Sequence, residues 1–341
     1  MALGTSLDRL FRFCLLPEDI ARTVFEMAAN DPDSPNWTCA LVSKKVQSWV
    51  EPILYRHIIF GLDNSRKMPL LHRTLLSSLA LSNNYPTSFK KPSFFSKYVR
   101  TLSLNVVPNW NALINLLNAC PNIHRLDFHR WMEAQRVDEL SVGNLPAWQS
   151  FQQLRRLHAP GMLFEPSYRH FRFDTGDHQN TMFKRLTHLE LYWDETLRSW
   201  SWGSLKSLPC LTHLCISPSP KIEAIELASA QLRAALACFP PTLVVCVFTI
   251  TSAHWFDNAR DLVEDNGSTL DDRIVVAVGD DYYWRQIAKG EQGQWVAREA
   301  IWRMQSSDLK ATVDNEDAFW KRAEKKVSER RRGQKSRLTY H

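Results

Sequence analysis

Hydrophobic and polar residues alternate in short segments that recur along the chain from residue 99 onward. Each segment carries two apolar residues three positions apart and then alternates, as in Leu186-Thr-His-Leu189-Glu-Leu191. Alternation with a period of two predicts a β-strand that buries one face. The segments begin at intervals of 24 to 32 residues, at positions 99, 123, 154, 186, 211, 243 and 274.

Helical patterns lie between these predicted strands. Leu113, Leu116 and Leu117 share one face of a stretch from 110 to 119, and a second stretch from 222 to 239 ends at a Pro-Pro pair. The alternation of strands and helices predicts the α/β class, with parallel strands. The order of helix, turn and Leu-x-x-Leu-x-Leu resembles a degenerate leucine-rich repeat, which implies an irregular solenoid with helices behind the strands. A conventional α/β domain is the alternative.

The N-terminal segment has a different, purely helical pattern. Apolar residues fall on one helical stripe at Ile20, Val24, Met27 and Ala28, after Pro17 and two acidic residues that suit a first turn. A second stripe runs from 42 to 50. Pro52 is expected to end that helix and to open a third, shorter one. Three short helices bury too little surface to be stable alone, so they must pack on the rest of the chain or on a partner.

Four short motifs in this segment occur in a fixed order. They are Leu16-Pro17-Glu18-Asp19-Ile20, Leu41-Val42-Ser43-Lys44, Trp49, and Leu54-Tyr55-Arg56-His57-Ile58. Together they resemble the F-box-like proteins that are abundant in mushroom-forming fungi. The resemblance implies docking to the Skp-type adaptor of cullin-based ubiquitin ligases, and through it to a cullin. The implied adaptor contacts are Leu16, Pro17, Ile20, Val24, Leu41, Val42 and Trp49. The alternative is a structural helical cap.

Members of that family pair the module with leucine-rich repeats, whose concave face binds a target. Polar positions between the buried ones, and aromatic residues near strand ends, are the candidates for target contact. These candidates are Ser103, Asp127, Trp131, His158, Glu190, Tyr192 and Trp193, with Cys215 and Val247 continuing the same row.

The C-terminal region is expected to cap the repeats, because the last unit of a solenoid would otherwise leave apolar surface bare. A helix is predicted for 281–304 within a cap spanning 281–320. A further amphipathic helix over 315–332 has Phe319, Trp320, Ala323 and Val327 on one side. The sequence thus divides into an extension (1–15), an F-box-like module (16–60), a connection (61–98), the repeats (99–280), the cap (281–320) and a basic tail (321–341).

Charge is concentrated in that tail. Residues 321–337 hold nine Lys or Arg and two Glu, a net +7, so the other residues sum to −1 of the total +6. A solvated basic face is the expectation, with a nuclear import signal as one alternative. The other is contact with nucleic acid or an anionic membrane surface. Nucleic-acid binding is expected only through the tail.

Catalytic signatures are missing from the sequence. It contains no Gly-x-x-x-x-Gly-Lys-Ser/Thr, Gly-x-Gly-x-x-Gly, His-Glu-x-x-His or Gly-x-Ser-x-Gly motif. Cys210, His213 and Cys215 lack a fourth metal ligand at suitable spacing. The acidic pairs at 271–272 and 280–281 are expected to solvate the ends of a strand. We therefore predict no enzymatic activity, no catalytic residues, no metal and no cofactor.

The expected location is the cytoplasm, the nucleus or both. No apolar run reaches the ~18–20 residues of a membrane span, and Asp8, Arg9 and Arg12 interrupt any N-terminal signal peptide. Seven scattered cysteines are expected to be reduced and mostly buried. The predicted function is a non-catalytic substrate receptor of a cullin-based ubiquitin ligase. The alternative is a protein-binding repeat scaffold unconnected to ubiquitin.

Overall fold

A computed structural model gives the arrangement of about half of the chain. The residues that it describes are 16–31, 36–60, 71, 74, 92–104, 110–128, 151–160, 181–193, 202–218, 225–250, 271–279, 301–304 and 316–338.

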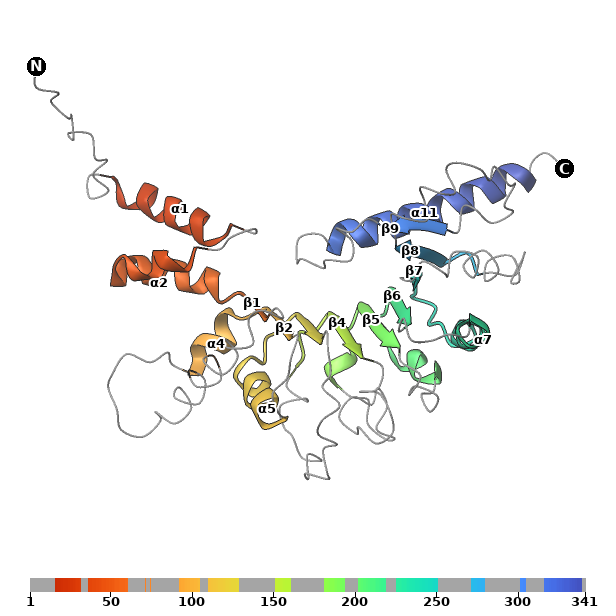
Figure 1. The fold of residues 1–341 in the computed structure, drawn as a ribbon, viewed down its shortest axis with the longest axis horizontal. Helices are drawn as coiled ribbons and strands as arrows, with labels where there is room; N and C mark the ends of the chain where they lie inside the picture. Colours follow the sequence, from red (N-terminus) through yellow and green to blue (C-terminus); the bar gives the residue numbers. More distant parts are fainter. Residues whose placement is uncertain are drawn as a thin grey trace, which may run out of the picture.

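The described strands form one parallel sheet of nine strands, in which the order along the sheet is the order along the chain. Figure 1 shows the sheet as an arc, with α4 (Pro92–Tyr98), α5 (Trp110–Ala119) and α7 (Ile225–Leu236) on its outer side. The fold is therefore α/β, with a single parallel sheet. The strands are β1 (His57–Phe60), β2 (Thr101–Leu104), β3 (Arg125–Phe128), β4 (Arg156–Pro160), β5 (His188–Trp193), β6 (His213–Pro218), β7 (Val245–Ile250), β8 (Ile274–Gly279) and β9 (Ile301–Met304).

The strand register places equivalent apolar residues side by side from one strand to the next. Leu102 pairs with Leu126, and the same row continues through the following strands. These side chains are buried in one large core beneath the outer helices. The row contains Ile58, Leu102, Leu126, Leu157, Leu189, Leu214, Cys246 and Ile274.

A ladder of backbone hydrogen bonds links the turns that precede the strands. The carbonyl of Arg56 accepts hydrogen bonds from the amides of Arg100 and Thr101, at 3.0 and 3.1 Å. The carbonyls of Arg100, His124, Arg155, Thr187 and Thr212 each accept two amides from the next turn in the same way. The donor amides belong to the two positions between the paired apolar residues of each unit, so the backbone of each turn is satisfied by its neighbour.

The N-terminal helices pack around a small core of their own. They are α1 (Glu18–Ala29), the 3-10 helix η2 (Trp37–Leu41) and α2 (Lys44–Leu54). Asn36 and Ser43 cap the second and third of these, because their side-chain oxygens accept the amides of Thr38 and Val46. The residues buried in this small core are Ala29, Cys39, Val46, Val50 and Leu54.

The predicted third helix after Pro52 is wrong. Pro52 lies inside α2, which continues to Leu54, and the next residues form β1. Proline removes one amide donor, but the helix has only two further residues to run. The amide of Tyr55 still closes the last turn by donating to the Glu51 carbonyl at 3.0 Å. β1 then adds to the edge of the sheet beside β2.

Two predictions about the C-terminal half also need correction. Ile274 pairs with Cys246, the fourth position of its unit, so the last unit begins at 271 and not at 274. Residues 301–304 were placed in the helical cap but form β9, which satisfies the open edge of β8. The boundary drawn at 320 falls within α11 (Glu316–Leu338). Residues 281–300, the rest of the predicted capping helix, lie outside the described residues.

Candidate functional site

The first candidate surface is an apolar patch on α1 and η2. Ile20, Val24 and Met27 are 47%, 43% and 70% exposed, and they follow each other at i, i+4 and i+7 on α1. Phe25, Ala28 and Ala29 on the same helix pack into the small core instead. The stripe predicted from the sequence therefore points largely to solvent. The patch, here named the α1–η2 patch, consists of Ile20, Val24, Met27, Trp37, Leu41 and Val42.

The predicted adaptor contacts divide between this patch and the small core. Leu41 and Val42 are 84% and 61% exposed, and Pro17 is exposed beside the start of α1. Leu16 is half-buried. Trp49 packs against the small core, with the ammonium of Lys45 5.7 Å from its ring centroid. Met27 and Trp37 join the patch without belonging to the predicted contacts, although Met27 lies on the same helical stripe as Ile20 and Val24.

The second candidate surface is the inner face of the sheet, where the predicted target-binding row lies. Ser103, Asp127, His158, Glu190 and Cys215 are aligned neighbours from β2 to β6. Ser103, Asp127 and Cys215 are buried, while His158 and Glu190 are half-buried. The predicted side-by-side arrangement is confirmed, but most of the row is covered and not open to a partner. Val247, the next member, is also fully buried.

Two ion pairs occupy the middle of this row. Nε of Arg125 lies 3.0 and 2.8 Å from the two carboxylate oxygens of Asp127, and both side chains are buried. Nδ1 of His158 lies 3.3 Å from Oε2 of Glu190. Burial by itself lowers the pKa of His158, but the charge and hydrogen bond of Glu190, with help from Asp127, outweigh it and raise the pKa. His158 is therefore held toward its charged form.

The aromatic candidates lie near the ends of the strands. Tyr192 is 36% exposed and is aligned with Pro160 and Ser217 on either side. The backbone of Trp193 pairs with Pro218 at the end of β5. Trp131 lies outside the described residues.

α11 covers the inner face over β6 to β8. Trp320, Ala323 and Val327 are buried against that face, with Phe319 at the margin, as the predicted stripe requires. Figure 1 shows α11 on the side of the sheet opposite α5 and α7. The basic side of the helix is largely exposed, as expected, while its apolar side is anchored on the sheet. The sheet residues beneath α11 are Cys215, Val245, Val247, Val275 and Ala277.

Polar contacts fix the first half of α11 over β4 to β6. Nη2 of Arg156 lies 2.5 Å from Oδ1 of Asp317, and Nε2 of His213 lies 2.8 Å from Oε1 of Glu324. The rings of His188 and His213 contact the indole of Trp320 edge-on, with centroids 5.4 and 5.1 Å away. Burial, then the neighbouring His213, lowers the pKa of His188 to about 3, so His188 is neutral.

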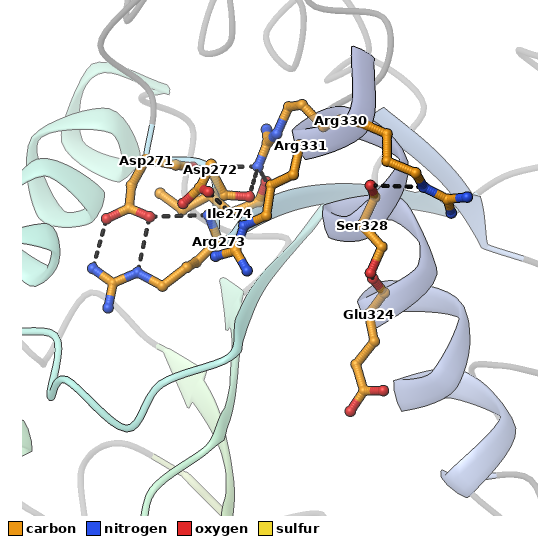
Figure 2. Close-up of polar contacts among 9 residues, drawn as sticks. Asp271, Asp272, Arg273, Ile274, Glu324, Ser328, Arg330 and Arg331 are labelled. Atoms are coloured by element: carbon orange, nitrogen blue, oxygen red, sulfur yellow. Dashed lines mark hydrogen bonds and ion pairs between the residues drawn. The ribbon is translucent and has the colours of Figure 1, made fainter. Parts of the chain in front are cut away.

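The second half of α11 is fastened to the turn before β8, as Figure 2 shows. Nη2 of Arg330 donates to the carbonyls of Asp271, Asp272 and Ile274, and Nε of Arg331 lies 2.5 Å from Oδ2 of Asp272. Asp271 pairs with Arg273, whose hydrogen bond lowers the pKa of the Asp271 carboxyl. Asp271 and Asp272 lie just before β8, the strand whose end they are expected to solvate, and both also make ion pairs, with Arg273 and Arg331.

The candidate metal ligands and reactive thiols do not come together in the described part of the chain. No three His, Cys, Asp or Glu side chains converge among the described residues to hold a metal ion. Cys210 is exposed, His213 is bonded to Glu324, and Sγ of Cys215 lies 3.7 Å from Oγ of Ser217. Burial raises the pKa of the Cys120 thiol to about 12, which keeps it protonated and unreactive. Asp280 and Asp281 lie outside the described residues.

Four of the six described cysteines are buried, as predicted, and all six are free thiols: Cys39, Cys120, Cys210, Cys215, Cys238 and Cys246. Among the described helices, none has both the length and the hydrophobicity that a bilayer crossing requires.

Comparison with known proteins gives no relative. No protein-family model, no curated protein and no solved structure matches the chain.

Proposed function

We propose that the chain is a non-catalytic receptor that links a target protein to a ubiquitin ligase. Its N-terminal helices dock a Skp-type adaptor, and its parallel-sheet region, an irregular leucine-rich repeat, holds the target. The chain does no chemistry, because the rate gain in such a complex comes from holding the target's lysines close to a conjugating enzyme.

The α1–η2 patch carries this proposal. Within the described residues nine large apolar side chains are exposed, and six of them fall between residues 20 and 42. α1 and η2 pack against each other, and exposed apolar side chains gathered on adjoining helices are typical of a site of protein association. The same residues belong to the motifs that resemble an F-box, so sequence pattern and exposure point to one surface.

The organisation of the sheet supports the repeat part of the proposal. All eight strand pairings are parallel and join consecutive strands, and the ladder of turn carbonyls repeats with them. Each unit of a solenoid contacts its neighbours in this manner. The shorter units, of 24 and 25 residues, have the length of ordinary leucine-rich repeats (about 20–29 residues), while those of 31 and 32 exceed it, which makes the repeat an irregular one.

The test is co-expression of the full chain with a fungal Skp-type adaptor, followed by size-exclusion chromatography. The expected result is co-elution in equal amounts, and its loss when Ile20 and Val24 are both replaced by Asp. Arg22→Asp is the matched control, since it adds the same charge to α1 at a position outside the α1–η2 patch. A folded chain that never co-elutes with the adaptor would instead favour a scaffold unconnected to ubiquitin, with the helices as a cap.

A further inference from the structure

The floor beneath α11 is an apolar surface that requires a cover. Cys215, Val245, Val247, Val275 and Ala277 lie on the inner face of β6 to β8 and are buried together with α11. They are separate from the large core on the other face of the sheet. Without a helix above them, these side chains would form an exposed apolar patch in a region that otherwise carries charged and polar residues.

Charged and aromatic groups surround this floor and determine which kind of helix can bind there. Arg156 and the rings of His188 and His213 lie on the β4–β6 side, and Asp272 lies at the turn before β8. The floor therefore presents a cation at one end, an apolar strip in the middle and an anion at the other end. An amphipathic helix that lies across the strands matches this order of charges.

α11 matches the floor through a narrow set of positions. Taking Trp320 as position i, a small residue follows at i+3 (Ala323) and a β-branched residue at i+7 (Val327). Acidic residues at i−3 and i+4 reach Arg156 and His213, and an arginine at i+11 reaches Asp272. Between these positions the helix is charged and solvated, so it owes its helical state largely to the sheet.

The ion pairs at these positions of α11 are individually weak, whereas the stronger polar contact of the helix is that of Arg330 with the turn before β8. Asp317 and Arg331 are exposed and Glu324 is half-buried, and ion pairs at such positions typically contribute up to about 1 kcal/mol each. Among the described side chains of α11, Trp320 is the large apolar one buried on the floor, and Arg330 is buried against the turn before β8. A helix of another protein with the same pattern of apolar and charged positions could therefore bind to the same floor in place of α11.

We infer that α11 is a displaceable ligand bound in cis, and that its floor on β6 to β8 is the site for a target helix. That target helix has a large aromatic residue at i, a small residue at i+3 and a β-branched residue at i+7. It also has acidic residues at i−3 and i+4 and arginine near i+11. The inference rests on the proposed function in treating the sheet as the target-binding region, and it is independent of adaptor docking.

The experiment measures binding of a fluorescein-labelled peptide with the sequence of residues 314–338 to the full chain. In the wild-type chain α11 competes for the floor, so the apparent affinity falls in proportion to the fraction of chains whose floor is free, about 100-fold if 99% are occupied. Trp320→Ala in the chain is expected to strengthen peptide binding about tenfold or more. Lys325→Ala, an exposed position on the same helix, should bind the peptide as the wild type does. A peptide that itself carries Trp320→Ala should fail to bind.

Hydrogen exchange of the unmodified chain supplies a second measurement. The amides of 316–338 are expected to exchange faster than those of β5 to β7 in the native state, because α11 detaches without global unfolding. Exchange of α11 only together with the strands would overturn the inference. A Trp320→Ala chain that stays folded but binds the peptide no better than wild type would also overturn the inference. Failure of the Trp320→Ala chain to fold would overturn it too, because α11 would then be part of the folded core and not a displaceable ligand. Co-elution with the adaptor tests the α1–η2 patch separately, so failure of one proposal does not imply failure of the other.

Discussion

The imidazole rings of His188 and His213 stack face to face, with centroids 4.2 Å apart and planes within 4° of each other. They come from neighbouring strands, and their residues are register partners in β5 and β6. Trp320 of α11 contacts both rings edge-on. The stack is therefore the point at which the C-terminal helix engages the middle of the sheet.

The buried position of His188 predicts a stability loss in mild acid. Burial, with the neighbouring His213 and Arg156, lowers its pKa to about 3 from the ordinary 6.5. As the pH falls below 6.5, the unfolded chain takes up the proton first, so stability is lost between pH 6.5 and about 3 and is fully present above that range. One such group contributes a slope of up to about 1.4 kcal/mol per pH unit.

Urea unfolding at pH 7.5, 6 and 5 tests this prediction. His188→Phe keeps an aromatic ring in the stack but cannot be protonated, so the variant should lose less stability than the wild type as the pH falls. His124→Phe is the control, because His124 is exposed and its pKa, though also lowered, departs less from the ordinary value. Identical pH profiles for the wild type and His188→Phe would refute the assignment.

Arg330 predicts where α11 is most sensitive to mutation. Its buried guanidinium donates to three backbone carbonyls of the turn before β8, including that of Ile274 at 2.7 Å. In Arg330→Met these carbonyls lose a charged donor, which costs about 2 kcal/mol. The expected readout is a roughly 30-fold faster hydrogen exchange of residues 316–338.

Arg332→Met provides the comparison on the same turn of α11. Arg332 is exposed, and its Nε donates to the Ser328 carbonyl at 3.3 Å within the helix. This substitution should change stability by less than about 0.5 kcal/mol. Equal effects of the two substitutions would mean that the contacts of Arg330 with the turn do not hold α11.

The strands that the sequence predicts well are those with strict alternation. Leu189 and Leu191 are buried while Glu190 between them is not, and local alternation of this kind is visible without any tertiary information. β1 and β9 are not predicted because neither carries the recurring Leu-x-x-Leu pattern, and β1 follows α2 after only two turn residues. Both strands form because an open edge of the sheet is available for pairing, and this tertiary feature cannot be predicted from the local sequence.

The position of α11 depends on contacts that are distant along the chain. Glu324 reaches His213 across 111 residues and Asp317 reaches Arg156 across 161. One local signal was nevertheless present, because Val245, Val247 and Val275 make β7 and β8 apolar on both faces. Strands with two apolar faces require cover on both sides. The apolar stripe of α11 is also visible in the sequence, but neither pattern tells that the helix covers this part of the sheet.

The ring of Tyr55 links the N-terminal helices to the sheet, and its removal tests how much this link contributes to stability. Its ring packs against both the small core and the large core, and it contacts Trp37 at 5.4 Å and Phe95 at 5.9 Å edge-on. Tyr55→Ala removes this link and should lower the free energy of unfolding by about 2–4 kcal/mol. Tyr55→Phe keeps the ring and should cost less than half as much. Guanidinium unfolding monitored by circular dichroism measures both, and equal losses would show that the hydroxyl and not the ring makes the link.

The exposure of the α1–η2 patch predicts that its residues matter for binding and not for folding. Leu41 and Met27 are the most exposed members, so Leu41→Asp and Met27→Asp should each shift the free energy of unfolding by less than about 0.5 kcal/mol. In a complex with the adaptor each aspartate would be buried without a partner charge. The affinity should then fall by about 2 kcal/mol or more, roughly 30-fold.

Trp49→Ala is expected to have the opposite effect, a loss of stability in the free chain, and serves as the comparison variant. Trp49 packs into the small core, so its loss should destabilise the N-terminal helices by about 2 kcal/mol or more before any partner is added. Thermal unfolding of each free variant and titration calorimetry with the adaptor separate the two effects. If Leu41→Asp and Met27→Asp bind the adaptor with wild-type affinity, then the exposed apolar residues do not form its docking surface. The helices would then serve as a cap on the sheet, because Tyr55, Trp37 and Phe95 would still join them to it.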